Sequence, residues 1–331
     1  MHTLSFTGER QLRYPAPDVA RGFMLALIAL ANVPFWLSYF PETPQAGHAA
    51  LEAMNGTDQW WYLVRTLFVD RRAYPLFSLL FGFGMAIMAS RTMERERRAI
   101  EQNVPAEVVA GWHPVQRQIV EESIERHVRR TASRLIRRRG WWMLAFGLLH
   151  GIVFSGDIIG AYGLVAVIFA EVIVMRRAWA RILAGSLVAV LSMSGLWMGG
   201  AMMGREPMVL EYHGPMPLNA WYSLVSFGSW IVATPMTVLT ALVVPCVMIG
   251  VGVARWGLLQ DPRGRGALLS GIAACGLGIG ALGGFPFALM QVDWAFAGSA
   301  VWSYPLFHAS GAAGACGWLA LLALVGGGPR E

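Results

Sequence analysis

Residues 137–174, RRRGWWMLAFGLLHGIVFSGDIIGAYGLVAVIFAEVIV, decide the fold that this sequence predicts. An apolar run over 141–154 is followed, after only three residues, by a second apolar run over 158–174. Two such runs joined by so short a polar turn predict a helical hairpin across a bilayer. His150 lies within the first helix and Asp157 lies at the turn. Because an ionisable side chain at membrane depth is costly without a partner or a watery cavity, this hairpin is the first candidate for a functional site.

The composition places the whole chain among multi-pass membrane proteins. Of its 331 residues, 56% are hydrophobic and only 14% are charged, which is far more apolar than a soluble domain of this length. The fold class that we predict is therefore all-α, a transmembrane helical bundle of about eight spans at ~20 residues per span. The predicted spans are 20–40, 73–90, 140–155, 158–175, 181–202, 230–254, 267–290 and 304–325.

The distribution of arginine predicts the orientation in the membrane. Basic residues are concentrated before the first span, over 91–139, over 176–181 and over 255–265. By the positive-inside rule these segments, and with them both termini, are cytoplasmic. The polar start lacks a cleavable signal, so we expect the first span to remain as an anchor in the cell (inner) membrane. Because most of the positive charge belongs to one loop, a nucleic-acid-binding surface is not expected.

The loop over 91–140 is the one long polar stretch. We expect it to belong to an N-terminal transmembrane module, 1–175, which a C-terminal transmembrane module, 176–331, follows. Two interpretations of the loop remain open. In the first, an amphipathic helix of the loop lies on anionic lipid headgroups. In the second, the arginines of the loop bind a phosphorylated cytoplasmic ligand, because guanidinium groups match phosphate oxygens. The apolar residues that give the loop its near-helical spacing are Val115, Ile119, Ile124, Val128 and Leu135, and the arginines are Arg134, Arg137, Arg138 and Arg139.

Polar side chains from separate stretches are predicted to share one depth near the outer surface. Asn32 and His150 each lie eleven residues beyond the arginine that begins their helix, about 16 Å at ~1.5 Å per residue. Arg72 enters the second span from the outer side, and Asp157 lies at the outer turn. Each has a structural alternative: Asn32 bonds between helices, Asp157 caps a helix and Arg72 extends to headgroups. His150 suits a general base that a carboxylate orients.

Three further features have simpler interpretations. The segment DVARGF, with Asp18, Arg21 and Gly22, is a helix-start motif in which an acidic side chain faces the positive end of the helix dipole. Residues 79–91 and 247–257 share a GxG pattern that hints at internal duplication. The three cysteines occur singly in apolar runs, so no metal site and no disulfide is predicted.

Three blocks of this chain, DVARGFMLALIALANVPFW, PLFSLLFGFGMAI and the hairpin quoted above, resemble in this order the YeiB-like bacterial membrane proteins, the domain-of-unknown-function family 418. The resemblance is specific through about residue 175 and looser to about residue 270. The residues that match are Asp18, Arg21, Gly22, Asn32, Arg72, Phe77, Ser78, Gly82, Gly84, Arg138, Arg139, His150, Gly156, Asp157 and Tyr162.

That family is similar to transmembrane acyltransferases, which include the lysosomal heparan-glucosamine N-acetyltransferase. The resemblance implies that an acyl group passes from a cytosolic coenzyme A thioester, as co-substrate, to an acceptor in the cell envelope. Arg138 and Arg139 would then bind the phosphates of the donor. Asn32, Arg72 and Tyr162 would bind substrate or stabilise the oxyanion.

The chain departs from these relatives in two ways. The lysosomal enzyme has its catalytic histidine just beyond the first-helix asparagine, where this chain offers only His48, so the catalytic pair His150 and Asp157 is our own inference. A Gly-Arg-Met-x-Leu-x-Asn-Tyr block is also not found, which favours either a shortened member or a site completed by a partner subunit or a second copy. The alternative functions are a transporter or exporter of a small envelope molecule, or a structural subunit of a membrane complex.

Overall fold

The computed structural model describes residues 15–32, 54–104, 111–153, 157–203, 220–259 and 262–327. Every regular element in these ranges is helical, which confirms the predicted all-α class. The helices are α1 (Pro15–Ala31), α4 (Gly56–Phe68), α5 (Ala73–Gln102), α7 (Pro114–Val153), α8 (Ile159–Val174), α9 (Ala178–Met203), α10 (Ala220–Thr240), α11 (Val243–Arg255), the short 3-10 turn η1 (Arg263–Arg265), α12 (Gly266–Gln291) and α13 (Ala300–Gly326).

The lengths and apolar character of these helices indicate a multi-pass membrane protein. Five helical stretches of the described chain are long and apolar enough to cross a bilayer, and α8 and α11 are apolar but shorter. The five stretches are Gly56–Gln102, Ala178–Met202, Ser223–Thr240, Gly266–Gln291 and Ala300–Gly326.

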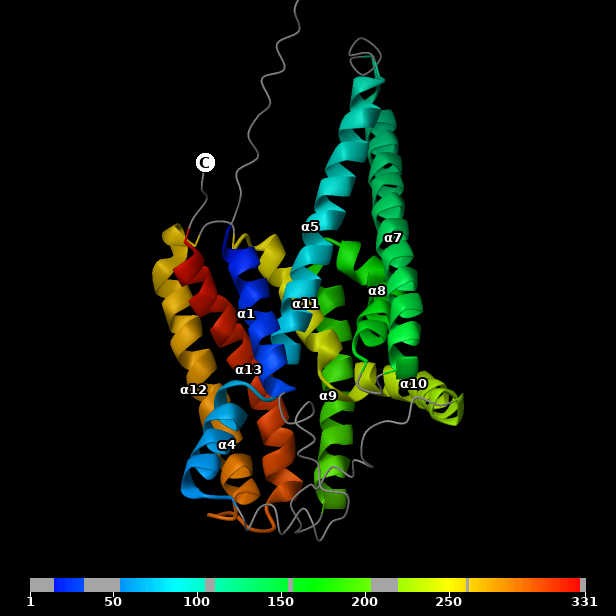
Figure 1. Cartoon of the computed structure of the whole chain (residues 1–331). Helices are drawn as coiled ribbons and strands as arrows, with labels where there is room; N and C mark the ends of the chain where they lie inside the picture. Colours follow the sequence, from blue (N-terminus) through cyan, green and yellow to red (C-terminus); the bar gives the residue numbers. More distant parts are fainter. Residues whose placement is uncertain are drawn as a thin grey trace, which may run out of the picture.

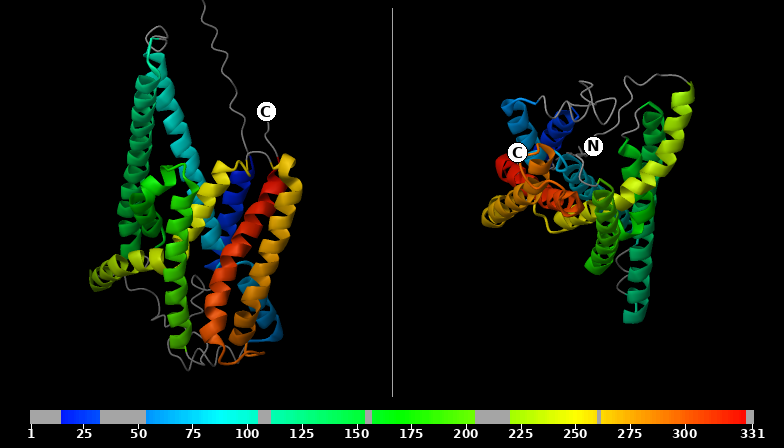
Figure 2. Two further views of the ribbon diagram at one scale, coloured as in Figure 1. Left: turned by 180° about the vertical axis from the view of Figure 1, so that it is seen from behind. Right: turned by 90° about the horizontal axis from the view of Figure 1, so that it is seen from below.

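Most of the helices run side by side in one bundle (Figure 1 and Figure 2). The start of α1 and the end of α13 lie at the same end of this bundle, and the polar ends of α5 and α7 project beyond it there (Figure 1). One main core of buried side chains joins α1, α5, α8, α11 and α13, so both halves of the sequence contribute to it.

Helices α5 and α11 cross at very close range through their GxG segments. A Cβ atom added at Gly82 would lie 2.8 Å from the carbonyl carbon of Val247, and one added at Gly250 would lie 2.8 Å from that of Leu79. Each contacted residue precedes its own helix's glycine by three positions, so the crossing is locally symmetric. Only glycine permits backbones to approach this closely, which explains the first glycine of each GxG segment as a packing contact.

The predicted sixth span, 230–254, is wrong as a single helix. The chain instead forms α10 and α11, and Leu242 between them has a left-handed backbone with φ 56°. A proline ring clashes with the carbonyl of the residue four positions earlier, so Pro245 prevents a helix from continuing through 241. Helix α10 lies across the bundle (Figure 1 and Figure 2).

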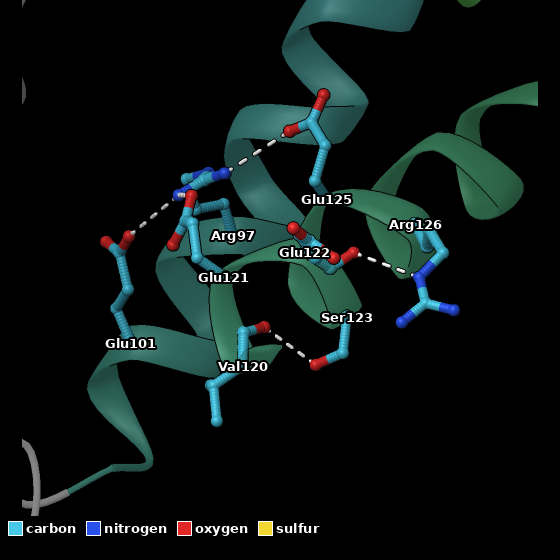
Figure 3. Close-up of polar contacts among 8 residues, drawn as sticks. All are labelled: Arg97, Glu101, Val120, Glu121, Glu122, Ser123, Glu125 and Arg126. Atoms are coloured by element: carbon cyan, nitrogen blue, oxygen red, sulfur yellow. Dashed lines mark hydrogen bonds and ion pairs between the residues drawn. The ribbon is translucent and has the colours of Figure 1, made fainter. Parts of the chain in front are cut away.

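The polar parts of α5 and α7, residues 91–102 and 114–131, form a two-helix stalk, and from Ser133 on, α7 also contacts Glu171 of α8. Of the apolar residues that give this part of α7 its helical spacing, Val128 is buried, whereas Val115 and Ile119 are each 58% exposed, so contact with anionic lipid headgroups stays a prediction. The two helices run antiparallel, and ion pairs join them near the tip. Arg97 lies 2.7 Å from Glu121 and 3.3 Å from Glu125, carboxylates that face it from α7 (Figure 3).

Candidate functional site

His150 and Asp157 meet where α7 folds back into α8. Imidazole Nδ1 of His150 lies 2.9 Å from Oδ1 of Asp157. A seven-residue separation on one continuous helix would not bring the two side chains together, but α8 packs alongside α7, so Asp157, just before α8 starts, lies beside the last turn of α7. The hairpin that the sequence predicts therefore creates this contact.

The Asp157 carboxylate is held by three further donors. The backbone N–H of Ile159 donates to Oδ1 at 3.1 Å, that of Gly160 to Oδ2 at 2.9 Å, and Nε1 of Trp230 to Oδ2 at 2.9 Å. The side chain of Asp157 is 0% exposed, whereas that of His150 is 45% exposed. A buried carboxylate requires such donors, and a helix N-terminus favours its negative charge. The Asp157 carboxylate thus both caps the start of α8 and holds the imidazole of His150 in position.

Trp230 is the member of this site that sequence reasoning missed. It comes from α10, and its ring packs on glycines of the other two helices: a Cβ at Gly151 would lie 2.8 Å from its Cγ, and one at Gly160 3.0 Å from its Cε2. Glycines on both helices of the hairpin indicate that a bulky side chain packs there, but they do not predict which helix provides it. In the structure α10 lies across the bundle and provides Trp230.

Tyr162 belongs to a separate contact between α8 and α5. Its hydroxyl lies 3.0 Å from Oγ of Ser78 and donates to the Tyr74 carbonyl at 3.1 Å. The ring lies 4.5 Å from that of Phe77 and 5.2 Å from that of Phe81, centroid to centroid, and the side chain is fully buried. Tyr162 therefore joins two helices in the core.

Arg72 and Asn32 also bond elsewhere. The buried guanidinium of Arg72 donates to the carbonyls of Thr66 at 2.9 Å and Asp70 at 2.7 Å and to that of Gly280 on α12. Its Cζ lies 5.1 Å from the centroid of the Phe307 ring. Asn32 donates to the Ile28 carbonyl of its own helix at 2.8 Å. The described hydrogen bonds thus do not bring Arg72, Asn32 or Tyr162 to the His150–Asp157 pair.

The helix-start motif and the arginines of α7 lie at the opposite end of the hairpin. Asp18 and Arg21 form an exposed ion pair of 3.0 Å, and a Cβ at Gly22 would meet nothing within 4 Å. Arg138 and Arg139 are both exposed, and Nη1 of Arg139 lies 2.8 Å from Sδ of Met88. Gly156 and His48 lie outside the described residues.

Arg21 and Arg139 share a cavity of about 660 Å³ between α1, α5 and α7. It is called the α1–α5–α7 groove below. His150 and Asp157 are not among its lining residues. The lining consists of Arg21, Met24, Leu25, Phe77, Leu80, Phe81, Gly84, Met85, Arg139, Trp142, Met143 and Phe146.

Comparisons with known proteins leave the family resemblance a prediction. No family model, no curated protein and no solved structure matches the chain. Within the described ranges, no three side chains of the His, Cys, Asp or Glu type lie close enough together to hold a metal ion.

Proposed function

We propose that this protein is a membrane acyltransferase in which His150 is the general base and Asp157 orients it. The observation that carries this proposal is the 2.9 Å contact between the two side chains, with Asp157 buried and His150 half exposed. A carboxylate that accepts from Nδ1–H selects the tautomer whose basic lone pair lies on Nε2. That nitrogen would take the proton from an acceptor hydroxyl or amine as it attacks the thioester carbonyl. The C–S bond would then break, and coenzyme A would leave as the thiol with the proton returned by the imidazole.

Asp157 suits the orienting role because its four hydrogen-bonding partners leave it little freedom to rotate. The two backbone donors of α8 and the indole of Trp230 hold the carboxylate, and the carboxylate in turn holds the imidazole. As the acceptor loses its proton, the imidazole becomes positively charged. The adjacent carboxylate would stabilise that charge without itself being protonated.

The acyl donor in this proposal is a coenzyme A thioester that approaches from the stalk end of the bundle. Arg138, exposed on α7, would contact its phosphates, while Arg139 lines the α1–α5–α7 groove. The distance along α7 from Arg138 to His150 is about 18 Å at ~1.5 Å per residue, which the donor must cover to deliver its acyl group.

We further propose a bacterial inner-membrane location with eight crossings and both termini cytoplasmic. Among the described residues, the stalk, the α8–α9 connection and the end of α11, which are rich in arginine, belong to the end of the bundle where α1 starts and α13 ends (Figure 1). Two of these arginines cap the C-terminal end of α8. Arg255 donates to the Ile173 carbonyl at 2.7 Å, and Arg181 donates to the Met175 carbonyl at 3.0 Å. In this topology α11 provides the sixth crossing and α10 lies within the membrane plane.

Acyl transfer can be measured with purified protein, radiolabelled acetyl-coenzyme A and a cell-envelope extract. We expect a labelled product whose formation falls by about 10²–10⁴-fold in His150→Ala, the range for loss of a general base. His127→Ala is the matched control, because His127 is 61% exposed on the stalk part of the same helix. It should retain wild-type labelling.

Asp157→Asn separates charge from helix capping, because asparagine is also a good N-cap. It should keep the fold of the hairpin and lower the transfer rate. Equal labelling by wild type and His150→Ala would remove His150 from the mechanism. If wild type gives no labelled product and coenzyme A causes no thermal stabilisation, the acyltransferase proposal is wrong, and stabilisation by an envelope molecule alone would favour a transporter.

A further inference from the structure

The α1–α5–α7 groove combines a charged end with an apolar body. Arg21 and Arg139 are the charged lining residues, and the other ten are apolar, aromatic or glycine. From the level of Arg139 the lining continues along α7 to Phe146, about 10 Å at ~1.5 Å per residue. On α5 it extends from Met85 back to Phe77, about 12 Å by the same rise.

The groove opens toward the surface that a bilayer would cover. Leu25 is 61% exposed, and Trp142 and Phe146 are each 62% exposed along its rim. Large apolar side chains this exposed on a membrane protein face hydrocarbon chains. A chain from the surrounding lipid can therefore enter the groove sideways without leaving the apolar phase.

The two guanidinium groups retain capacity for an anion. In the described part of the chain, the acceptor within reach of Arg139 is the thioether sulfur of Met88, at 2.8 Å, and sulfur is a weak acceptor. Nη1 of Arg21 donates to Asp18 at 3.0 Å, but a guanidinium has five N–H donors. Gly84 places no side chain in front of Arg21, since a Cβ there would lie 3.7 Å from its Nη2.

We infer that the α1–α5–α7 groove binds an anionic phospholipid, with its phosphate on Arg21 and Arg139 and one acyl chain along the apolar lining. Arginine forks bind phosphate through paired, charge-assisted hydrogen bonds. The charged end of the groove lies beside the polar stalk, where headgroups of a bilayer would lie. This inference goes beyond the proposed function and does not depend on acyl transfer.

A coenzyme A thioester fits the groove less well than a lipid. Its pantetheine arm carries amide groups, and the apolar part of the lining offers them no hydrogen-bonding side chains beyond the indole of Trp142. Burying an amide without a partner costs roughly 1–3 kcal/mol in proteins. An alkyl chain has no such groups, so the lining selects a lipid.

Native mass spectrometry of delipidated, detergent-purified protein tests this inference. The protein is offered equal amounts of phosphatidylglycerol and phosphatidylcholine with identical acyl chains. Both lipids carry the phosphate, but the quaternary ammonium of phosphatidylcholine is repelled by Arg21 and Arg139. We therefore expect wild type to retain the anionic lipid about tenfold better, which corresponds to about 1.4 kcal/mol. Arg139→Gln removes the phosphate contact and Gly84→Leu fills the groove, so both should lose most of this preference.

Two matched variants control for charge and for size. Arg177→Gln removes an exposed arginine of the α8–α9 connection, and Gly271→Leu adds the same side chain where a Cβ of α12 meets nothing within 4 Å. Both should keep the preference. Equal retention of the two lipids by wild type, or an unchanged preference in both groove variants, would overturn the inference, as would displacement of the bound lipid by micromolar coenzyme A thioester.

A second measurement needs no variant and so does not depend on their folding. A phosphatidylglycerol analogue with a diazirine in its acyl chain is photolysed with wild-type protein in vesicles, and labelled peptides are identified by mass spectrometry. We expect labels over 77–85 on α5 and 142–146 on α7 that excess unlabelled phosphatidylglycerol removes. Labels that appear only on the outer faces of α9 and α12 would contradict the inference.

Discussion

The close crossing of α5 and α11 gives the sharpest prediction, because the GxG segment contains its own control. Gly250→Ala would drive a methyl group into the Leu79 backbone, whose carbonyl carbon lies 2.8 Å from the added Cβ. Backbone cannot move aside as a flexible side chain can. Overpacking of this kind costs about 1–3 kcal/mol. Gly252→Ala, two positions later, meets nothing within 4 Å and should gain up to ~1 kcal/mol of helix propensity.

The two variants should therefore differ by about 1–4 kcal/mol in the free energy of unfolding, which is a factor of about 5–850 in the ratio of folded to unfolded protein. Titration of the purified protein with sodium dodecyl sulfate in mixed micelles, followed by circular dichroism, measures this difference. On α5, Gly82→Ala and Gly84→Ala form an equivalent pair, and the first should be the damaging one. If Gly250→Ala and Gly252→Ala unfold at the same detergent fraction, the crossing does not limit stability.

Three further variants test separate contacts. Arg72→Lys keeps the positive charge but loses the planar guanidinium that donates to the Gly280 carbonyl on α12. We expect it to lower the free energy of unfolding by about 2–4 kcal/mol in the same detergent titration. Unfolding at the wild-type detergent fraction would contradict this. Trp230→Phe keeps the packing but removes the donor to Asp157, and should cost about 1–2 kcal/mol; no change would mean that the indole bond is not needed. Arg97→Ala should lower global stability by no more than ~1 kcal/mol yet speed hydrogen exchange at the stalk tip, an effect that 1 M salt should remove.

The sequence predicted the elements whose signals are local. Apolar runs with arginine between them gave an all-helical membrane protein, and the short polar turn gave the hairpin that joins His150 to Asp157. The GxG segments were noticed only as a possible repeat. The contacts of Gly82 with the α11 backbone and of Gly250 with the α5 backbone cannot be predicted from either segment alone. They depend on how two helices that are distant in the sequence cross.

The sequence predicts depth in the membrane better than direction around the bundle. Counting residues predicts that Asn32 and His150 share one depth, but a shared depth does not say which side chains face each other. Arg72 instead lies against α4, α12 and α13, and its carbonyl partners are backbone groups that no sequence pattern announces. The split of 230–254 into two helices likewise depends on Leu242 adopting a left-handed conformation. Trp230 reaches Asp157 only because α10 turns across the bundle.

Helix α7 is a single rod of 40 residues, about 60 Å long at ~1.5 Å per residue, with the stalk at one end and His150 three residues from the other. In the topology proposed above, this rod would act as a lever with its pivot near the membrane surface. Tilting the outer arm by ~5° about Arg139 would displace the imidazole by roughly 1.4 Å, since it lies about 16 Å beyond the pivot. Misplacing a catalytic group by ~1 Å can cost about a hundredfold in rate. In that topology a force on the stalk would reach His150 through α7 itself, and the bonds from Ser133 and Arg137 to Glu171 of α8 would have to move with the rod.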